Sequence, residues 1–189
     1  EFSGTLSQSD QGEFKKDQSK LLQSYQQLYR FTKQYEQQLM QTYPASTQML
    51  QVTQYVLQDR IHSLSTVIPY YVSYNYYQQI NNDQQAKKAY DQYNTKRDQV
   101  MAKHLTWITE TLYPNQKIIV WAHNLHIRKA NTKTNNPNRS AIANLGELLP
   151  EKIKKKSYVL GLYMNRGVSA LNDRKPLTVQ YPHPSGSVE

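Results

Sequence analysis

Apolar residues recur at three-and-four spacing through most of the first 112 residues, and prolines interrupt the pattern. This spacing places apolar side chains along one face of a helix. A first such stretch begins at Lys20 and ends at Pro44, and a second begins at Thr47 and meets Pro69. Because proline breaks or kinks a helix, we predict two amphipathic helices, with a kink or break at the second proline.

A third long helix is predicted upstream of Pro114. Asn81-Asn82-Asp83 precedes it, and these residue types are favoured at helix N-termini. The residues that follow keep the helical period as far as Leu112. We therefore expect a helical segment over residues 15–112.

The pattern changes in the residues that follow. Lys117 to His123 reads Lys-Ile-Ile-Val-Trp-Ala-His, a short and largely β-branched run that is typical of a strand buried on both faces. Ile142–Ile153 fits a short helix, Tyr158–Tyr163 a second strand and Leu177–Tyr181 a third. This order predicts an α/β fold, in which the long helices are followed by a small parallel or mixed sheet with flanking helices.

The length of 189 residues is that of one domain. We expect residues 113–182 to form an α/β segment that completes a single domain with the helices, and residues 1–14 and 183–189 to be tails. The longest purely apolar run, Ile118–Ala122, is far below the roughly 20 residues that cross a bilayer. We expect neither a membrane span nor an intact signal peptide.

The net charge of +9 lies almost entirely in the last part of the chain. Residues 1–116 carry a balance of +1, whereas residues 117–189 hold 12 Lys and Arg against 4 Asp and Glu. One hypothesis is therefore a basic binding module for an anionic polymer, such as nucleic acid or a cell-envelope polyanion. A solvated surface explains the charge equally well. Nucleic acid is the less favoured partner, because the basic residues lack the interleaved aromatics of single-strand binders.

Several kinds of chemistry have no residues to support them. The absence of Cys excludes disulfides, cysteine-based zinc sites and thiol nucleophiles, and no Gly-x-Ser-x-Gly elbow or Gly-rich phosphate loop is present. Chemistry must therefore use His, carboxylate, hydroxyl or Arg groups. Together with the missing initiator Met and a pI near 9.5, the lack of Cys suits an exported bacterial protein, with a cytoplasmic enzyme as the alternative.

The candidate site follows the first predicted strand. His123, Asn124 and His126 stand directly after it, and ligands gather at the carboxyl ends of strands in open α/β sheets. Imidazole exchanges a proton near neutral pH, so either histidine can serve as a general base for water, and the amide can bind substrate. Two alternatives stay open, a pair of surface histidines and a His-x-x-His metal site. We expect no metal, because no third ligand lies nearby in sequence.

Four blocks of sequence resemble, in the same order, motifs of the erythromycin esterase-like family, also known as succinoglycan biosynthesis protein-like. They are Arg97–Ile108 with its Arg-Asp and Met-Ala pairs, Lys117–Arg128 with the histidines, Leu145–Leu149 with its Leu-Gly, and Tyr158–Gly167. Together they span about residues 95 to 170.

This resemblance implies a hydrolase of carboxylic esters or lactones in which histidines activate water, without a covalent intermediate and without a cofactor. His123 and His126 match the two histidines that follow the strand in the family, and Arg97 matches an arginine that lines the same pocket. The implied partner is a small-molecule ester. The sequence does not distinguish a macrolide lactone from another ester as the substrate.

The family's earlier Gly-Glu-x-x-His motif, which supplies the principal base, has no counterpart in this sequence. Gly12-Glu13 and Gly146-Glu147 both lack the following His. The resemblance therefore implies that this chain is the C-terminal portion of such a protein. It is expected to be incomplete as a catalyst alone and to need the N-terminal portion as its partner.

Overall fold

A computed structural model describes residues 8–134, 142–162, 167–170 and 175–178. The chain divides into two compact units, Glu1–Lys156 and Ser157–Glu189. Helices build the described part of the first unit, and the second contains a pair of short strands. In the residues that the structure describes, no helix is both long and apolar enough to cross a membrane.

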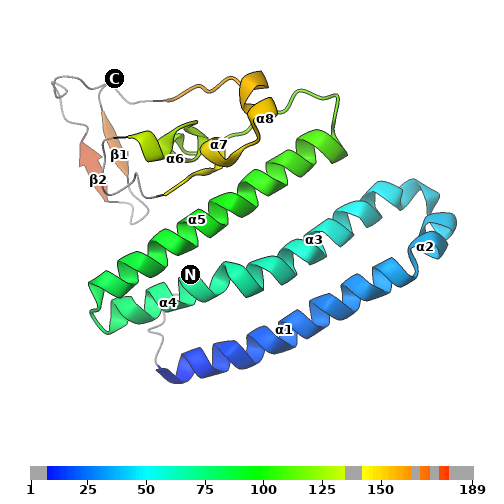
Figure 1. Cartoon of the computed structure of the whole chain (residues 1–189), viewed down its shortest axis with the longest axis horizontal. Helices are drawn as coiled ribbons and strands as arrows, with labels where there is room; N and C mark the ends of the chain where they lie inside the picture. Colours follow the sequence, from blue (N-terminus) through cyan, green and yellow to red (C-terminus); the bar gives the residue numbers. More distant parts are fainter. Residues whose placement is uncertain (1–7, 135–141, 163–166, 171–174, 179–189) are drawn as a thin grey trace. The chain divides into compact units, whose positions relative to one another are not determined.

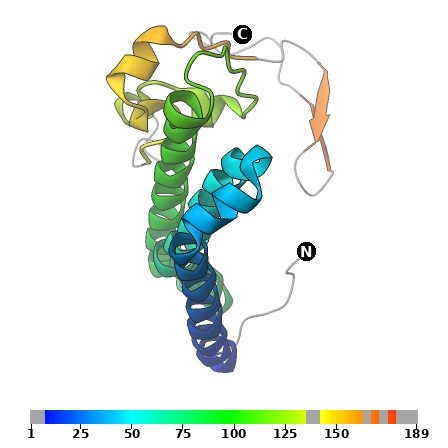
Figure 2. The same cartoon turned by 90° about the vertical axis from the view of Figure 1, so that its right-hand side faces the viewer.

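The first unit begins with two pairs of packed helices. The first pair is α1 (Gln8–Gln34) and α3 (Thr47–Thr66), joined through α2 (Glu36–Thr42) and the 3-10 turn η1 (Pro44–Ser46). The second pair is α4 (Ile68–Gln79) and α5 (Asp83–Trp107), with α5 continuing into the π-helical turn η2 (Ile108–Leu112). Figure 1 shows α1 beside α3 and α4 beside α5, and Figure 2 shows the same helices turned by 90°.

The predicted helical segment is confirmed, but the first predicted helix, from Lys20 to Pro44, is two helices: α1 begins earlier, at Gln8, and Tyr35 separates it from α2. The boundaries at the prolines and at Asn82 follow from local sequence. Pro44 is the first residue of the 3-10 turn after α2. Pro69 lies in the first turn of α4, where a backbone N–H has no partner within the helix, so the N–H that proline lacks costs no helical hydrogen bond. The side chain of Asn82 caps α5, because it accepts a hydrogen bond of 3.2 Å from the backbone N–H of Gln85.

Small and aromatic residues join α4 to α5. Ala86 and Ala89 are buried on α5, and residues without bulk let two helix backbones approach closely. Tyrosines from both helices also contact one another. The ring centroids are 5.1 Å apart for Tyr71 and Tyr93 and 5.2 Å apart for Tyr74 and Tyr90.

Short helices complete the first unit: α6 (Asn124–Ile127), η3 (Asn131–Lys133), α7 (Leu145–Leu148) and α8 (Glu151–Lys156). The helix predicted over Ile142–Ile153 is therefore two helices. Leu149 adopts an extended conformation because Pro150 follows it, and this separates α7 from α8. Leu145 and Leu149 pack with Ala102 of α5 to form a buried apolar cluster.

The predicted parallel or mixed sheet is wrong for the residues that the structure describes. The segment 117–122 forms no strand, and neither does 158–162, while Tyr163 lies outside the described residues. Within the described ranges, the strands are β1 (Val168–Ala170) and β2 (Pro176–Thr178). They pair antiparallel, with Val168 opposite Thr178.

Non-local pairing is the physical reason for this difference. A strand that is buried on both faces needs neighbouring strands for its backbone hydrogen bonds, and a β-branched run carries no information about their presence. The predicted third strand overlaps β2 at Leu177 and Thr178, and its residues 179–181 lie outside the described part. Residues 1–7 and the predicted tail 183–189 also lie outside it. The predicted single domain with a boundary at residue 113 stays a prediction.

Candidate functional site

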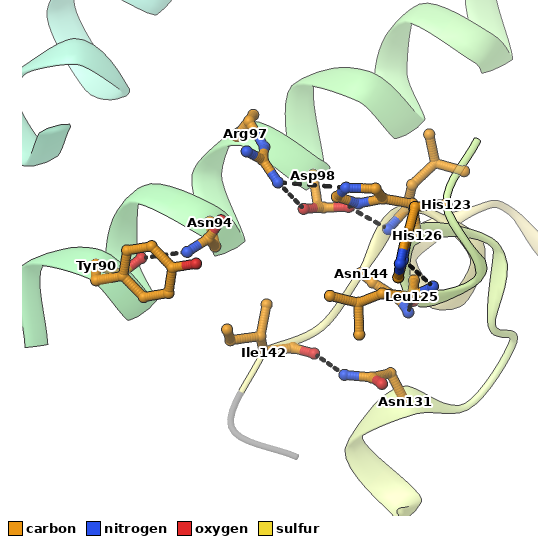
Figure 3. A network of polar contacts seen from close by, with 11 residues as sticks. Tyr90, Asn94, Arg97, Asp98, His123, Leu125, His126, Asn131, Ile142 and Asn144 are labelled. Carbon is orange, nitrogen blue, oxygen red and sulfur yellow. Dashed lines mark hydrogen bonds and ion pairs between the residues drawn. The ribbon is translucent and has the colours of Figure 1, made fainter. Parts of the chain in front are cut away.

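Three side chains from α5 and α6 meet in the first unit. Nδ1 of His126 lies 2.8 Å from Oδ1 of Asp98, and a guanidinium nitrogen of Arg97 lies 3.4 Å from Nε2 of the same imidazole. The guanidinium is also 3.8 Å from Oδ2 of Asp98. Figure 3 shows the three side chains pointing toward one another. The structure thus brings together Arg97 and His126, which are 29 residues apart in sequence.

Asp98 is the buried centre of this cluster, with 1% of its surface exposed. A buried carboxylate requires compensating donors. Besides the His126 contact, Oδ1 accepts a 2.9 Å hydrogen bond from the backbone N–H of Leu145, the first residue of α7. Asp98 therefore connects α5 to both α6 and α7.

These contacts determine the tautomer of a neutral His126. A carboxylate can only accept, so Nδ1 carries the proton and donates it to Asp98. Nε2 is then the unprotonated nitrogen, and it faces the guanidinium donor of Arg97. The side chain of His126 retains 22% exposure, so solvent reaches the imidazole. Nε2 can take a proton once the guanidinium no longer donates to it, and the resulting imidazolium is stabilised by Asp98 and opposed by the charge of Arg97.

His123 has the opposite arrangement. It is the N-cap of α6, and its Nδ1 accepts a 3.1 Å hydrogen bond from the backbone N–H of Leu125. A neutral His123 therefore carries its proton on Nε2 and is a donor there. The residue is exposed, and no hydrogen bond or ion pair joins it to Arg97 or Asp98 in the described part of the chain.

The remaining predicted site residues lie on the same two helices. Arg97 stacks over the ring of Tyr93, with its guanidinium carbon 5.5 Å from the ring centroid, and its side chain is 37% exposed. Asn124 is the first residue of α6 and is half-buried.

Close packing between α6 and α7 supports the cluster. Asn144 caps α7 by accepting from the N–H of Glu147, and its amide donates to the carbonyl of Leu125. A Cβ added to Gly146 would lie 2.5 Å from the carbonyl oxygen of Ile127 and 2.6 Å from that of Arg128. Glycine at this position therefore allows the direct contact between the two short helices.

Asp98 is a member of the site that was not among the residues predicted from the sequence. A signal for it existed, because Asp98 is the one charged residue on the buried face of α5, four residues from both Asn94 and Ala102. A carboxylate at such a position implies a partner from another element. Pattern reasoning alone does not identify that partner as His126.

A second histidine–aspartate pair joins α3 to α5. Nε2 of His104 lies 2.8 Å from Oδ1 of Asp59. Tyr55 packs edge-on against His104 and stacks on Trp107 at a centroid separation of 4.0 Å. Burial, with a smaller contribution from the Asp59 charge, raises the pKa of the Tyr55 hydroxyl. This pair has the same length as the site pair and provides an internal comparison.

Several basic residues of the C-terminal region are already paired. Lys152 lies 2.7 Å from Glu110, and Lys154 lies 2.7 Å from Glu151 and donates to the backbone carbonyl of Glu147. These contacts reduce the charge available to an anionic polymer. Within the described ranges, no three His, Asp or Glu side chains group in a way that could hold a metal ion.

Comparisons with known proteins match nearly the whole chain. The model of the family described as "Erythromycin esterase" matches residues 3–189. The Bacillus subtilis (strain 168) protein named "Putative hydrolase YbfO" is 34% identical over 194 residues, which cover 94% of this chain and 39% of that protein. The chain therefore spans about two fifths of the relative's length, and no solved structure matches it. The resemblance of the four sequence blocks is confirmed, and the chain belongs to the erythromycin esterase family.

Proposed function

We propose that this chain supplies part of the active site of a hydrolase that cleaves a carboxylic ester or lactone of a small molecule. The family and the name of the relative point to a hydrolase. The observation that carries the proposal is the buried contact between Asp98 and Nδ1 of His126, which leaves Nε2 able to accept a proton.

In the proposed reaction, water is the nucleophile. Nε2 of His126 takes a proton as the water oxygen attacks the ester carbonyl carbon, and Asp98 stabilises the resulting imidazolium. The tetrahedral intermediate then collapses, the bond to the leaving oxygen breaks, and that oxygen takes a proton. The imidazolium of His126 gives its Nε2 proton to that oxygen and becomes neutral again, while the Nε2–H of neutral His123 donates a hydrogen bond to the leaving oxygen and keeps its proton. The opposite tautomers of the two histidines suit these two roles.

Arg97 and Asn124 are proposed to bind the substrate. The guanidinium is beside Nε2 of His126, so a substrate carbonyl oxygen bound to it would lie close to the attacking water. A fixed positive charge at this position would stabilise the oxyanion of the intermediate. Water and side chains suffice for these steps.

The resemblance assigns a further base to a Gly-Glu-x-x-His motif that this sequence does not contain. We therefore propose that complete catalysis requires the rest of a longer protein, in line with the 39% of the relative that the chain covers. Assays of the proposal use the full-length protein.

Replacing Arg97 tests the proposed function. In the full-length protein, Arg97→Ala should lower ester hydrolysis about 10²- to 10³-fold, because it removes the donor for the developing oxyanion. Arg97→Lys should retain part of the rate, since it keeps the charge and loses the planar fork. The measurement is kcat and KM with a macrolide lactone and with an aryl acetate.

Arg60 provides the control, because it is an exposed arginine on α3. Arg60→Ala should leave both constants unchanged. The proposal is wrong if the unmodified full-length protein hydrolyses neither ester, or if Arg97→Ala is as active as the unmodified protein.

A further inference from the structure

Four tyrosines form a continuous set of ring contacts between α4 and α5. Tyr71 and Tyr74 belong to α4, and Tyr90 and Tyr93 belong to α5. The ring centroids are 5.2 Å apart for Tyr90 and Tyr74, 6.5 Å for Tyr74 and Tyr71, and 5.1 Å for Tyr71 and Tyr93. We call these four residues the tyrosine strip.

The tyrosine strip ends at the candidate site. The guanidinium of Arg97 stacks over the ring of Tyr93, and it also contacts Nε2 of His126. Tyr90, Tyr93 and Arg97 are three and four residues apart, so they share one face of α5. Figure 3 shows Tyr90 on the part of α5 that leads to Arg97. At a rise of about 1.5 Å per residue, Tyr93 and Tyr90 lie about 6 Å and about 10 Å from Arg97 along the helix.

Two rings of the tyrosine strip have surface that a ligand can cover. Tyr71 is 39% exposed and Tyr90 is 44% exposed, whereas Tyr74 and Tyr93 are half-buried. Aromatic rings favour tilted contacts with one another, and the rings of the strip already make such contacts at interplanar angles of 41–49°. A further aromatic ring can extend this packing and remove apolar surface from water.

The surroundings of the strip favour a ring without charge. All twelve residues of α4 are uncharged. On the turn of α5 that contains Tyr90, Lys87 and Asp91 are paired with each other at 2.6 Å. A charged ring would lose hydration on binding and would find no opposite charge on α4 to compensate for the loss.

We propose that the tyrosine strip binds a neutral aromatic ring of the ester substrate, one to two turns of α5 away from the carbonyl group at Arg97. The inference rests on the proposed function, which places the ester beside Arg97 and His126. It narrows the substrate class to esters that carry an aromatic ring on a short linker. An aliphatic ring of the same size can cover the strip, but it cannot make aromatic contacts with the tyrosines.

Two esters with matched leaving groups test the proposal in the full-length protein. Phenylpropyl acetate and cyclohexylpropyl acetate both release a primary alcohol, so their intrinsic reactivities are nearly equal. The phenyl ester should have a kcat/KM about 3- to 10-fold higher, the effect of one aromatic contact, and the difference should lie in KM. Equal values of kcat/KM, or a preference for the cyclohexyl ester, would overturn the proposal.

Variants of Tyr90 assign the preference to the strip. Tyr90→Leu should abolish the preference for the phenyl ester, and Tyr90→Phe should keep it, because the ring is retained. Tyr43→Leu is the matched control, since Tyr43 is a 61% exposed tyrosine between α2 and η1 and the preference should survive its replacement. If Tyr90→Leu lowers the melting temperature and leaves the preference unchanged, the strip serves packing alone and the proposal is wrong.

Binding of amide analogues separates a failure of the strip from a failure of hydrolysis. Phenylpropyl and cyclohexylpropyl acetamide resist hydrolysis, so calorimetric titration reports their binding alone. The phenyl compound should bind about 3- to 10-fold more tightly, and Tyr90→Leu should remove the difference. This difference in binding, found in a protein that hydrolyses neither ester, would reject the proposed function and support the ring-binding strip. Hydrolysis of both esters without a difference in binding would reject the strip alone.

Discussion

Asp98→Asn in the full-length protein is expected to lower ester hydrolysis by about 10²- to 10⁴-fold, with little change in melting temperature. The side-chain volume is nearly unchanged, and the amide oxygen can still accept the N–H of Leu145. Because Nδ1 of His126 contacts the same oxygen, the amide oxygen keeps both contacts, and the amide nitrogen takes the place of Oδ2 near Arg97. The negative charge that stabilises the imidazolium of His126 is lost, so the proposed base is weakened although its tautomer is kept.

Asp59→Asn is the matched control for this prediction. Asp59 makes an imidazole contact of the same 2.8 Å length with His104, using side chains that the proposed reaction does not involve. Turnover should therefore stay at the level of the unmodified protein. Comparable losses of activity in the two variants would show that any broken histidine–aspartate pair disturbs the protein, and the specific role of Asp98 would be rejected.

Gly146→Ala is expected to destabilise the protein by about 1–3 kcal/mol, the usual cost of forcing extra atoms into a packed region. The new Cβ would overlap the carbonyl oxygens of Ile127 and Arg128, and both are backbone atoms that cannot rotate away. Separation of α6 from α7 would also displace the Leu145 N–H from Asp98. Thermal melting and ester hydrolysis should both decrease.

Gly12→Ala should have the opposite effect on the stability of the protein. Gly12 lies in α1 with no atom within 4 Å of the position that a Cβ would take, so alanine should stabilise the helix by about 0.5–1 kcal/mol.

A melting temperature for Gly146→Ala at or above that of the unmodified protein would mean that α6 and α7 do not pack in this way.

The paired histidines explain why one short motif can support two different roles. His123 and His126 are three residues apart, yet the first accepts a backbone N–H at Nδ1 and the second donates from Nδ1 to a carboxylate. The spacing showed that both imidazoles follow the same segment. Their different protonation patterns depend on Leu125 and Asp98, of which only the former is a sequence neighbour.

The sequence by itself determined the helical half of this protein. The signals at Pro44, Pro69 and Asn82 act within one or two helical turns, so the helix boundaries that they predict agree with α2 through α5. Arg97 and His126 were also predicted as site residues from the sequence, through the resemblance to family motifs. The helix boundaries depend on local backbone geometry, and the family motifs can be identified without knowledge of the fold.

The tertiary structure alone decided which partners these residues have. Asp98 meets His126 across 28 residues and the Leu145 N–H across 47, and Gly146 is required by carbonyl groups of another helix. The run from Ile118 to Ala122 has the composition of a buried strand, but its described surroundings provide no strand to pair with it. The physical reason is common to these cases: helices satisfy their hydrogen bonds within a few residues, whereas buried charges, close helix contacts and sheets depend on groups that are distant in sequence.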